Sequence, residues 1–161
     1  MLAHYPTHNS RFGKMRTPMH KSLSILVAVA TLATGSALAA EHLQLVERDA
    51  TETTIDIGAK GDSVGDLLTF ANPVFDAANK TQLGSDQGYC VRVIAGKSWE
   101  CIWTLSLKEG QITIEGPFLD VGDSLFSVTG GTGKYAGAKG QLKMHKRDGK
   151  ATAYDFSYDL L

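Results

Sequence analysis

Residues 99–108 constrain the fold more than any other stretch, because apolar and polar side chains alternate along them. The odd positions from Trp99 to Leu107 are all apolar, and four of the five even positions are polar or charged. A β-strand places alternate side chains on opposite faces, whereas a helix repeats every 3.6 residues and cannot separate this pattern. The segment is therefore predicted to be a strand with one buried face.

Similar short runs follow one another along the chain, separated by glycine-containing turns, and no amphipathic helix longer than a turn or two stands out. About eight short, regularly spaced strands indicate an all-β sandwich or a closed barrel, and the pattern does not distinguish the two. Strands are predicted at residues 43–49, 65–75, 87–94, 99–108, 111–115, 124–130, 140–146 and 153–160, and a short run at 53–57 extends or follows the first of them.

The first 39 residues have the three parts of a secretory signal peptide. Basic residues precede an apolar run at residues 23–38, the small residues Ala37 and Ala39 close it, and the first acidic residue is Glu41. This arrangement predicts cleavage after Ala39, leaving residues 40–161 as one domain that is secreted or periplasmic. A membrane anchor is disfavoured because the run is short and rich in small residues. Met15 or Met19 is an alternative start.

Removal of this leader leaves 12 Lys and Arg against 17 Asp and Glu, a formal net charge of −5. An acidic surface repels phosphate backbones, so a nucleic-acid partner is not expected, nor is a membrane partner once the leader is removed. The remaining histidines, His42 and His145, lie near opposite ends of the domain, and no metal site is expected.

A glycine-rich run at residues 128–135 imitates a phosphate-binding loop. Its spacing does not fit, since Tyr135 rather than Ser or Thr follows Lys134, and the next segment reads as a strand instead of a helix. We interpret the run as a tight corner between antiparallel strands, where glycine supplies positive φ.

Several segments in one order resemble allene oxide cyclases, a family related to the dirigent proteins. The resemblance implies an eight-stranded antiparallel β-barrel, commonly trimeric, that closes the ring of an unstable fatty-acid allene oxide in a dry pocket without a cofactor. The leader indicates an exported bacterial member. The matching segments are GDLLTFAN (65–72), GYCV (88–91), WECIW (99–103), IEGPF (114–118), VTGGTG (128–133) and GAKGQLK (137–143).

The resemblance also implies a set of site residues. Glu47 and Asn72 are the candidate catalytic residues: a carboxylate would stabilise the cation formed as an epoxide opens, and an amide holding a water would donate to the developing oxyanion. Strand parity supports both, since Glu47 shares a face with Leu45, and Asn72 shares one with Phe70. The candidate substrate-binding residues are Phe70, Cys90, Trp99, Trp103 and Phe118, and the predicted pocket walls also include Leu68, Ile112 and Ile114.

Three functions remain open at this point. The first is a cofactor-free cyclase or isomerase of a reactive lipid-like substrate. The second is a non-catalytic secreted barrel that binds a small apolar ligand. The third is a dirigent-like protein that steers a coupling reaction initiated elsewhere.

Cys90 and Cys101 are the only cysteines in the chain. A two-residue hairpin turn near Ala95 and Gly96 would pair residues whose numbers sum to about 191, which places the two cysteines opposite each other on the inward face. We therefore predict a disulfide, which an exported protein would retain. In the related family the matching cysteine is instead a free thiol in the pocket.

Overall fold

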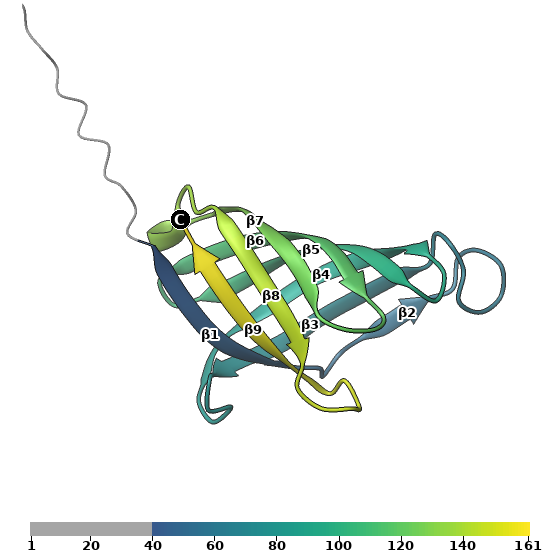
Figure 1. Cartoon of the computed structure of the whole chain (residues 1–161), viewed down its shortest axis with the longest axis horizontal. Coiled ribbons are helices and arrows are strands. Elements are labelled where there is room, and N and C mark those ends of the chain that lie inside the picture. Colours follow the sequence, from purple (N-terminus) through teal and green to yellow (C-terminus); the bar gives the residue numbers. More distant parts are fainter. Residues whose placement is uncertain (1–39) are drawn as a thin grey trace, which may run out of the picture. The chain divides into compact units, whose positions relative to one another are not determined.

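The computed structural model describes residues 40–161, which form a closed antiparallel β-barrel of eight strands (Figure 1). Consecutive strands pair around the barrel, and β1 closes it by pairing with both β9 and β3. This confirms the predicted all-β fold and decides between the barrel and the sandwich. The barrel strands are β1 (Glu41–Arg48), β3 (Leu67–Asp76), β4 (Gln82–Ile94), β5 (Ser98–Leu107), β6 (Gly110–Leu119), β7 (Ser124–Gly131), β8 (Gly140–Lys146) and β9 (Ala153–Leu160). The predicted signal peptide, residues 1–39, lies outside the described residues.

A ninth, short strand, β2 (Thr53–Ile55), follows β1 and pairs with β3. β1 pairs with the end of β3 near Val74, and β2 pairs with its beginning near Leu68. The two strands therefore occupy successive parts of the same side of β3. Residues 49–52 link them, and this gap in the ladder lies beside the middle of β3.

Two strands are longer than the alternation predicted. β4 begins at Gln82, five residues before the predicted start, and β6 continues through Gly116 and Pro117 to Leu119. The sequence around Gly84 and Ser85 looks like a turn, but both residues pair with β3 and with β5. The strand context overrides the local turn preference here.

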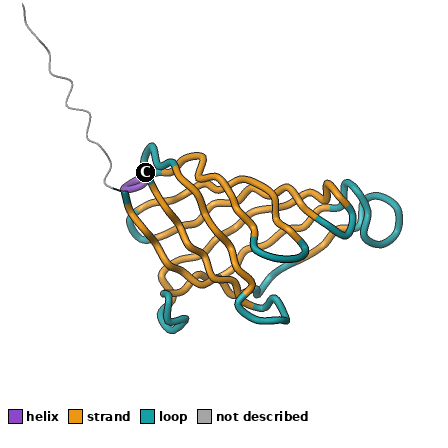
Figure 2. The backbone as a smooth tube through the Cα atoms, in the orientation of Figure 1, coloured by secondary structure: helices purple, strands orange, loops and turns teal. Residues whose placement is uncertain are grey.

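The glycine-rich run forms the predicted corner between antiparallel strands. β7 ends at Gly131, a single 3₁₀ turn η1 (Gly133–Tyr135) follows, and β8 begins at Gly140 (Figure 2). Gly133 and Gly140 both have positive φ, of 60° and 139°, as the corner requires. Within residues 40–161, no helix has the length and apolar composition needed to cross a bilayer.

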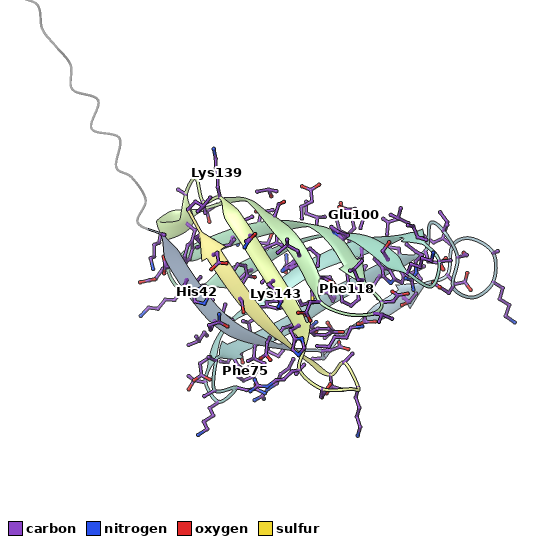
Figure 3. All side chains as sticks on the ribbon, viewed as in Figure 1. His42, Phe75, Glu100, Phe118, Lys139 and Lys143 are labelled. Atoms are coloured by element: carbon purple, nitrogen blue, oxygen red, sulfur yellow. A yellow bond between two sulfur atoms is a disulfide. The ribbon has the colours of Figure 1, made fainter. Side chains whose placement is uncertain are left out.

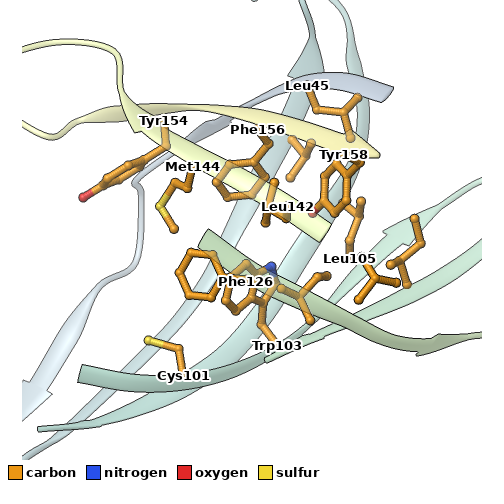
Figure 4. Packing of buried hydrophobic residues seen from close by; sticks show 14 of the residues in the cluster. Leu45, Cys101, Trp103, Leu105, Phe126, Leu142, Met144, Tyr154, Phe156 and Tyr158 are labelled. Atoms are coloured by element: carbon orange, nitrogen blue, oxygen red, sulfur yellow. The ribbon is translucent and has the colours of Figure 1, made fainter. Parts of the chain in front are cut away.

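The barrel interior is densely packed at one end. Leu45, Leu105 and Tyr158 gather at one side of the core cluster, and Cys101, Met144 and Tyr154 lie at the other (Figure 4). The first group belongs to a solid apolar core that also contains Val74, Ile112, Ile114 and Leu142, all 0% exposed. The outer face carries exposed polar side chains, among them His42, Glu100, Lys139 and Lys143 (Figure 3).

Candidate functional site

A pocket of about 40 Å³ lies in the barrel interior, away from the packed end. It has aromatic and sulfur-containing walls, together with four carboxylate or amide side chains. Its lining consists of Glu47, Asp49, Glu52, Leu68, Phe70, Asn72, Cys90, Cys101, Trp103, Phe118, Met144, Tyr154 and Phe156.

The inward positions of β4 explain how a large indole reaches this site. Gly88 lies opposite Trp103 across the β4–β5 ladder. A Cβ atom on Gly88 would collide with the Cβ of Trp103, so glycine permits the close approach. The Trp103 ring packs edge-to-face against Phe126 at a centroid distance of 4.6 Å and lies 6.3 Å from Phe70. These contacts make a rigid aromatic wall.

The predicted pair of catalytic residues converges in this pocket. Glu47 on β1 and Asn72 on β3 are 5% and 4% exposed, and Asn72 Nδ2 donates a hydrogen bond of 2.6 Å to Glu47 Oε1. The Asn72 Oδ1 atom accepts hydrogen bonds from the backbone N–H groups of Ala50 (2.9 Å) and Thr51 (3.1 Å). Asn72 therefore anchors the β1–β2 link and orients Glu47 at the same time.

The environment of Glu47 disfavours its ionised form. Burial raises the pKa of Glu47 to about 7, and the nearby negative charge of Asp49 adds to this, while the hydrogen bond from Asn72 opposes it. Asp49 and Glu52 lie at the edge of the pocket, where burial and the charge of Asp49 also raise the pKa of Glu52. None of the described residues that line the pocket is Lys, Arg or His. The site therefore has a negative potential, which the Lys146 ammonium, 5.3 Å from the centroid of the Phe118 ring, reduces at Glu52.

A further carboxyl group lies behind Glu47. Asp86 on β4 is 1% exposed and faces Asn72 across the β3–β4 ladder. Burial, followed by the negative charge of Glu47, raises the pKa of Asp86 to about 9. Sequence reasoning missed Asp86 because the predicted strand began one residue after it. Extending the inward parity of Cys90 and Gly88 back by one more step would have found it.

The predicted disulfide is present and forms part of the pocket wall. Cys90 and Cys101 are directly paired on β4 and β5 with a Cα–Cα distance of 4.0 Å, and both are buried. The register agrees with the prediction, but the turn does not. Three residues, 95–97, form the turn, and a register shift between Arg92 and Ile94 compensates for the extra residue.

Trp99 does not line this pocket, unlike the other predicted binding residues. It packs beneath Arg92, whose guanidinium carbon lies 4.1 Å from the ring centroid, and borders a separate hollow of about 360 Å³. Arg92 also forms ion pairs with Asp62 (2.6 Å) and Asp120 (2.7 Å). Trp99 precedes Cys101 by two residues on β5, on the side away from Trp103. It therefore lies outside the pocket, in the cluster around Arg92.

Seven predicted residues thus surround one pocket, and three others do not. Ile112 and Ile114, predicted as walls, belong to the packed core: both are 0% exposed, and they pair with Leu105 and Trp103 across the β5–β6 ladder. Met144, Tyr154 and Phe156 line the pocket but were not among the candidates, although the aromatic alternation of the last strand was visible in the sequence. The seven are Glu47, Leu68, Phe70, Asn72, Cys90, Trp103 and Phe118. Among residues 40–161, no three His, Cys, Asp or Glu side chains are placed to hold a metal ion.

Comparison with known families gives a match over most of the described chain. A family model described as allene oxide cyclase matches residues 40–148. The match begins at the first described residue and includes every predicted site residue.

Solved structures with the same fold come from proteins with several different names. A pyocyanin demethylase is 24% identical, with a TM-score of 0.66 over 75% of this chain and 100% of its own. A pterocarpan synthase dirigent protein is 14% identical, with a TM-score of 0.62 over 76% of this chain and 93% of its own. An exo-specific intermolecular Diels-Alderase is 17% identical, with a TM-score of 0.60 over 74% of this chain and 98% of its own. At these identities the likeness establishes the fold alone.

Proposed function

The chain belongs to the allene oxide cyclase family, and we propose that it is a cofactor-free cyclase or isomerase of a small, reactive, lipid-like molecule. The observation that carries the proposal is the Glu47 carboxyl group, oriented by Asn72 in an aromatic pocket whose lining holds no cation. Such a site is suited to a substrate that develops positive charge as it reacts.

The proposed reaction rearranges bonds without gaining or losing atoms. A C–O bond of an epoxide breaks, positive charge spreads over the adjoining unsaturated carbons, and a C–C bond between the ends of this system closes the ring. The carbon that keeps the epoxide oxygen also carries a C=C bond, as in an allene oxide, so the oxygen remains as a carbonyl. The Glu47 carboxylate stabilises the delocalised cation, and the faces of Phe70 and Trp103 add a cation–π contribution. Asn72 acts as a positioning residue, because its amide already bonds to Glu47 and to the β1–β2 link.

The pocket also favours a folded substrate. Its volume of about 40 Å³ is much smaller than the ~300–1,000 Å³ of a typical ligand site, so only the reacting part of a substrate fits without side-chain movement. Enclosure of that part by Phe70, Trp103 and Phe156 would bring the two carbon ends together, which is catalysis by proximity.

Turnover of the allene oxide of an unsaturated fatty acid by Glu47→Gln protein tests the proposal. The substitution keeps the size of the side chain and removes its charge, so we expect turnover to fall by about 100-fold or more, with ligand affinity nearly unchanged. Glu115→Gln, at an exposed position on β6, is the matched control and should retain full turnover. An unchanged rate in the Glu47→Gln protein would refute the assignment.

The same assay separates the two alternative functions. A binding barrel would hold the epoxide with a measurable Kd but convert none of it. A dirigent-like protein would leave the epoxide unchanged and would instead alter the stereochemistry of radical coupling when a separate oxidant generates the radicals. The dirigent fold likeness makes this second control worthwhile.

We further propose that the protein is exported after cleavage following Ala39. The support is the small-residue site at Ala37–Ala39 and the change from basic to acidic character at Glu41. Intact-mass measurement on exported protein should give a chain that begins at Ala40 or Glu41. A stable exported product that retains residues 23–38 would contradict this.

Assembly into a homo-oligomer, a trimer by family resemblance, is also proposed. An exposed apolar row runs along the outer face of β4, where Tyr89, Val91 and Val93 are 49%, 37% and 50% exposed. Ile55 on β2, 45% exposed, adds to this apolar surface. Light scattering should give a multiple of the monomer mass, and Val91→Glu should reduce it. A monomeric wild-type protein would refute assembly.

A further inference from the structure

Asp86 has no evident structural role that would justify a buried acid. Its side chain is 1% exposed, and neither carboxyl oxygen contacts an N–H or O–H donor among residues 40–161. Its partners across the two neighbouring ladders are Asn72 on β3 and the fully buried Leu105 on β5. An unpaired carboxylate in such surroundings would be strongly destabilising, so Asp86 must either be neutral or have another partner.

The negative charge of the Glu47 carboxyl group, after burial, raises the pKa of Asp86, so the two buried acids lie close enough to interact. Two buried carboxylates that interact in this way repel each other and do not both ionise near neutral pH, so the pair retains one proton. A retained proton would allow one of the two groups to donate a hydrogen bond to the other, because an ionised carboxylate can only accept.

The remaining contacts decide which residue carries the proton. Glu47 accepts a hydrogen bond of 2.6 Å from Asn72, and this donor favours the ionised form of Glu47. Asp86 has no such donor and is the more buried of the two. We propose that Asp86 is the neutral, proton-bearing positioning residue of this pair, which donates a hydrogen bond to the Glu47 carboxylate and holds it in place beside the pocket.

This inference rests on the proposed function for the role of Glu47, but the protonation of Asp86 can be observed without any substrate. Other titratable groups also face the pair. Asp49 and Glu52 at the pocket edge add negative charge, and Lys146 on β8 lowers the pKa of Glu52. Tyr154 and Tyr158 lie on β9. Burial raises the pKa of each hydroxyl group above its usual value, so both stay neutral near pH 7.

The arrangement predicts how two substitutions at position 86 differ. Asp86→Asn retains an N–H donor for Glu47 and removes the second ionisable group. Asp86→Leu removes the donor as well, so the Glu47 carboxylate loses one of its two stabilising hydrogen bonds. A residue that only fills space would give the same Glu47 titration in both variants.

The test is an NMR titration of the carboxyl carbons in uniformly ¹³C-labelled protein. In the wild type, we expect Asp86 to be protonated at pH 7 and to ionise at higher pH than Glu47. In Asp86→Asn, Glu47 should be the one remaining buried carboxyl, with a midpoint close to or below the wild-type value. In Asp86→Leu, its midpoint should rise by about one pH unit or more. Asp155→Asn, an outward position on β9, is the control and should leave Glu47 unchanged.

If a variant fails to fold, wild-type protein alone still tests the proposal. The infrared carbonyl band of a protonated carboxylic acid should persist at pH 8, where Glu47 is mostly ionised and Asp86 is not. Two ionised carboxylates at pH 7 would overturn the proposal, as would equal Glu47 midpoints in the two variants. If the titrations agree with the proposal but no epoxide is turned over, the proposed function fails while the role of Asp86 stands.

Discussion

Two clusters of buried charge occupy the barrel, and they differ in whether the charges are balanced. The arginine cluster consists of Arg92, Asp62, Asp120 and Trp99: its cation is 8% exposed, pairs with two carboxylates and stacks on the indole. The acid pair, Glu47 and Asp86, has an amide donor from Asn72, and none of the ion pairs among residues 40–161 includes either carboxyl group. Each cluster lies near one end of the β4–β5 hairpin's inward face, with the Cys90–Cys101 disulfide between them.

The difference separates a structural role from a chemical one. In the arginine cluster, Asp62 also accepts a hydrogen bond from the Gly96 N–H, and the Arg92 backbone bonds to Asp66, so three loops are tied together. The acid pair forms no ion pair that connects loops among residues 40–161. Its burial disfavours the ionised form of both carboxyl groups. Groups with strongly perturbed pKa values that line a pocket are candidates for function.

Loss of the arginine cluster should have the largest effect on stability. Arg92→Met removes the cation and leaves Asp62 and Asp120 facing each other, so we expect the free energy of unfolding to fall by about 2–4 kcal/mol. The exposed pair Lys143–Asp123 is the control, and Lys143→Met should cost less than about 1 kcal/mol. Urea denaturation measures both, and equal effects would contradict a special role for Arg92.

Loss of the disulfide should have the next largest effect. The bond closes a loop with a sequence separation of 11, and replacing both Cys90 and Cys101 with Ala should lower the free energy of unfolding by about 2–3 kcal/mol. Thiol titration of unfolded, unreduced wild-type protein should detect no free thiol. Two reactive thiols per chain would show that the pocket wall contains free cysteines instead.

The alternation of side chains was sufficient to predict most of the barrel strands and several of the residues that line the pocket. Parity placed Glu47 and Asn72 inside, and the hairpin register paired Cys90 with Cys101. These inferences are local or depend on one register, which is why they could be made. Closure of the barrel is different, because the pairing of β1 with β3 and β9 joins distant segments, and there the family resemblance supplied the answer.

The parts that could not be predicted depend on three-dimensional packing. Arg92 shares the inward parity of Cys90, but nothing local indicated that Asp62 and Asp120 would meet it from two loops. Asp86 was missed because the predicted strand began at Gln87, whereas β4 begins at Gln82. Trp99 and Trp103 both point inward from β5. Only their different depths in the barrel place one in the arginine cluster and the other in the pocket.

The pH dependence of stability should also distinguish the clusters. Folding raises the pKa values of Glu47 and Asp86, so the folded state binds more protons than the unfolded chain at neutral pH. Stability should therefore fall as pH rises from about 4.5 to 9. The double variant Glu47→Gln, Asp86→Asn should flatten this slope, whereas an equally steep slope would contradict the assignment.

At low pH the opposite behaviour is expected from a different group. Hydrogen bonds from the backbone N–H groups of Ser63, Ile57 and Gly58 lower the pKa of Asp66. Its contribution to stability is present above its unfolded pKa and is lost as pH falls through the lower folded value. Stability should therefore be greatest at mildly acidic pH, and Asp66→Asn should reduce the loss on further acidification.

The central claim is that small molecules bind beside the acid pair and not at the arginine cluster. The two tryptophans report on these places separately, since Trp103 lines the pocket and Trp99 lies beneath Arg92. A brominated fatty-acid methyl ester quenches indole fluorescence only on close approach, which makes it a suitable neutral probe. Titration of Trp99→Phe protein should give saturable quenching of Trp103, and Trp103→Phe protein should give little. Saturable quenching of Trp99 with none of Trp103 would contradict the account.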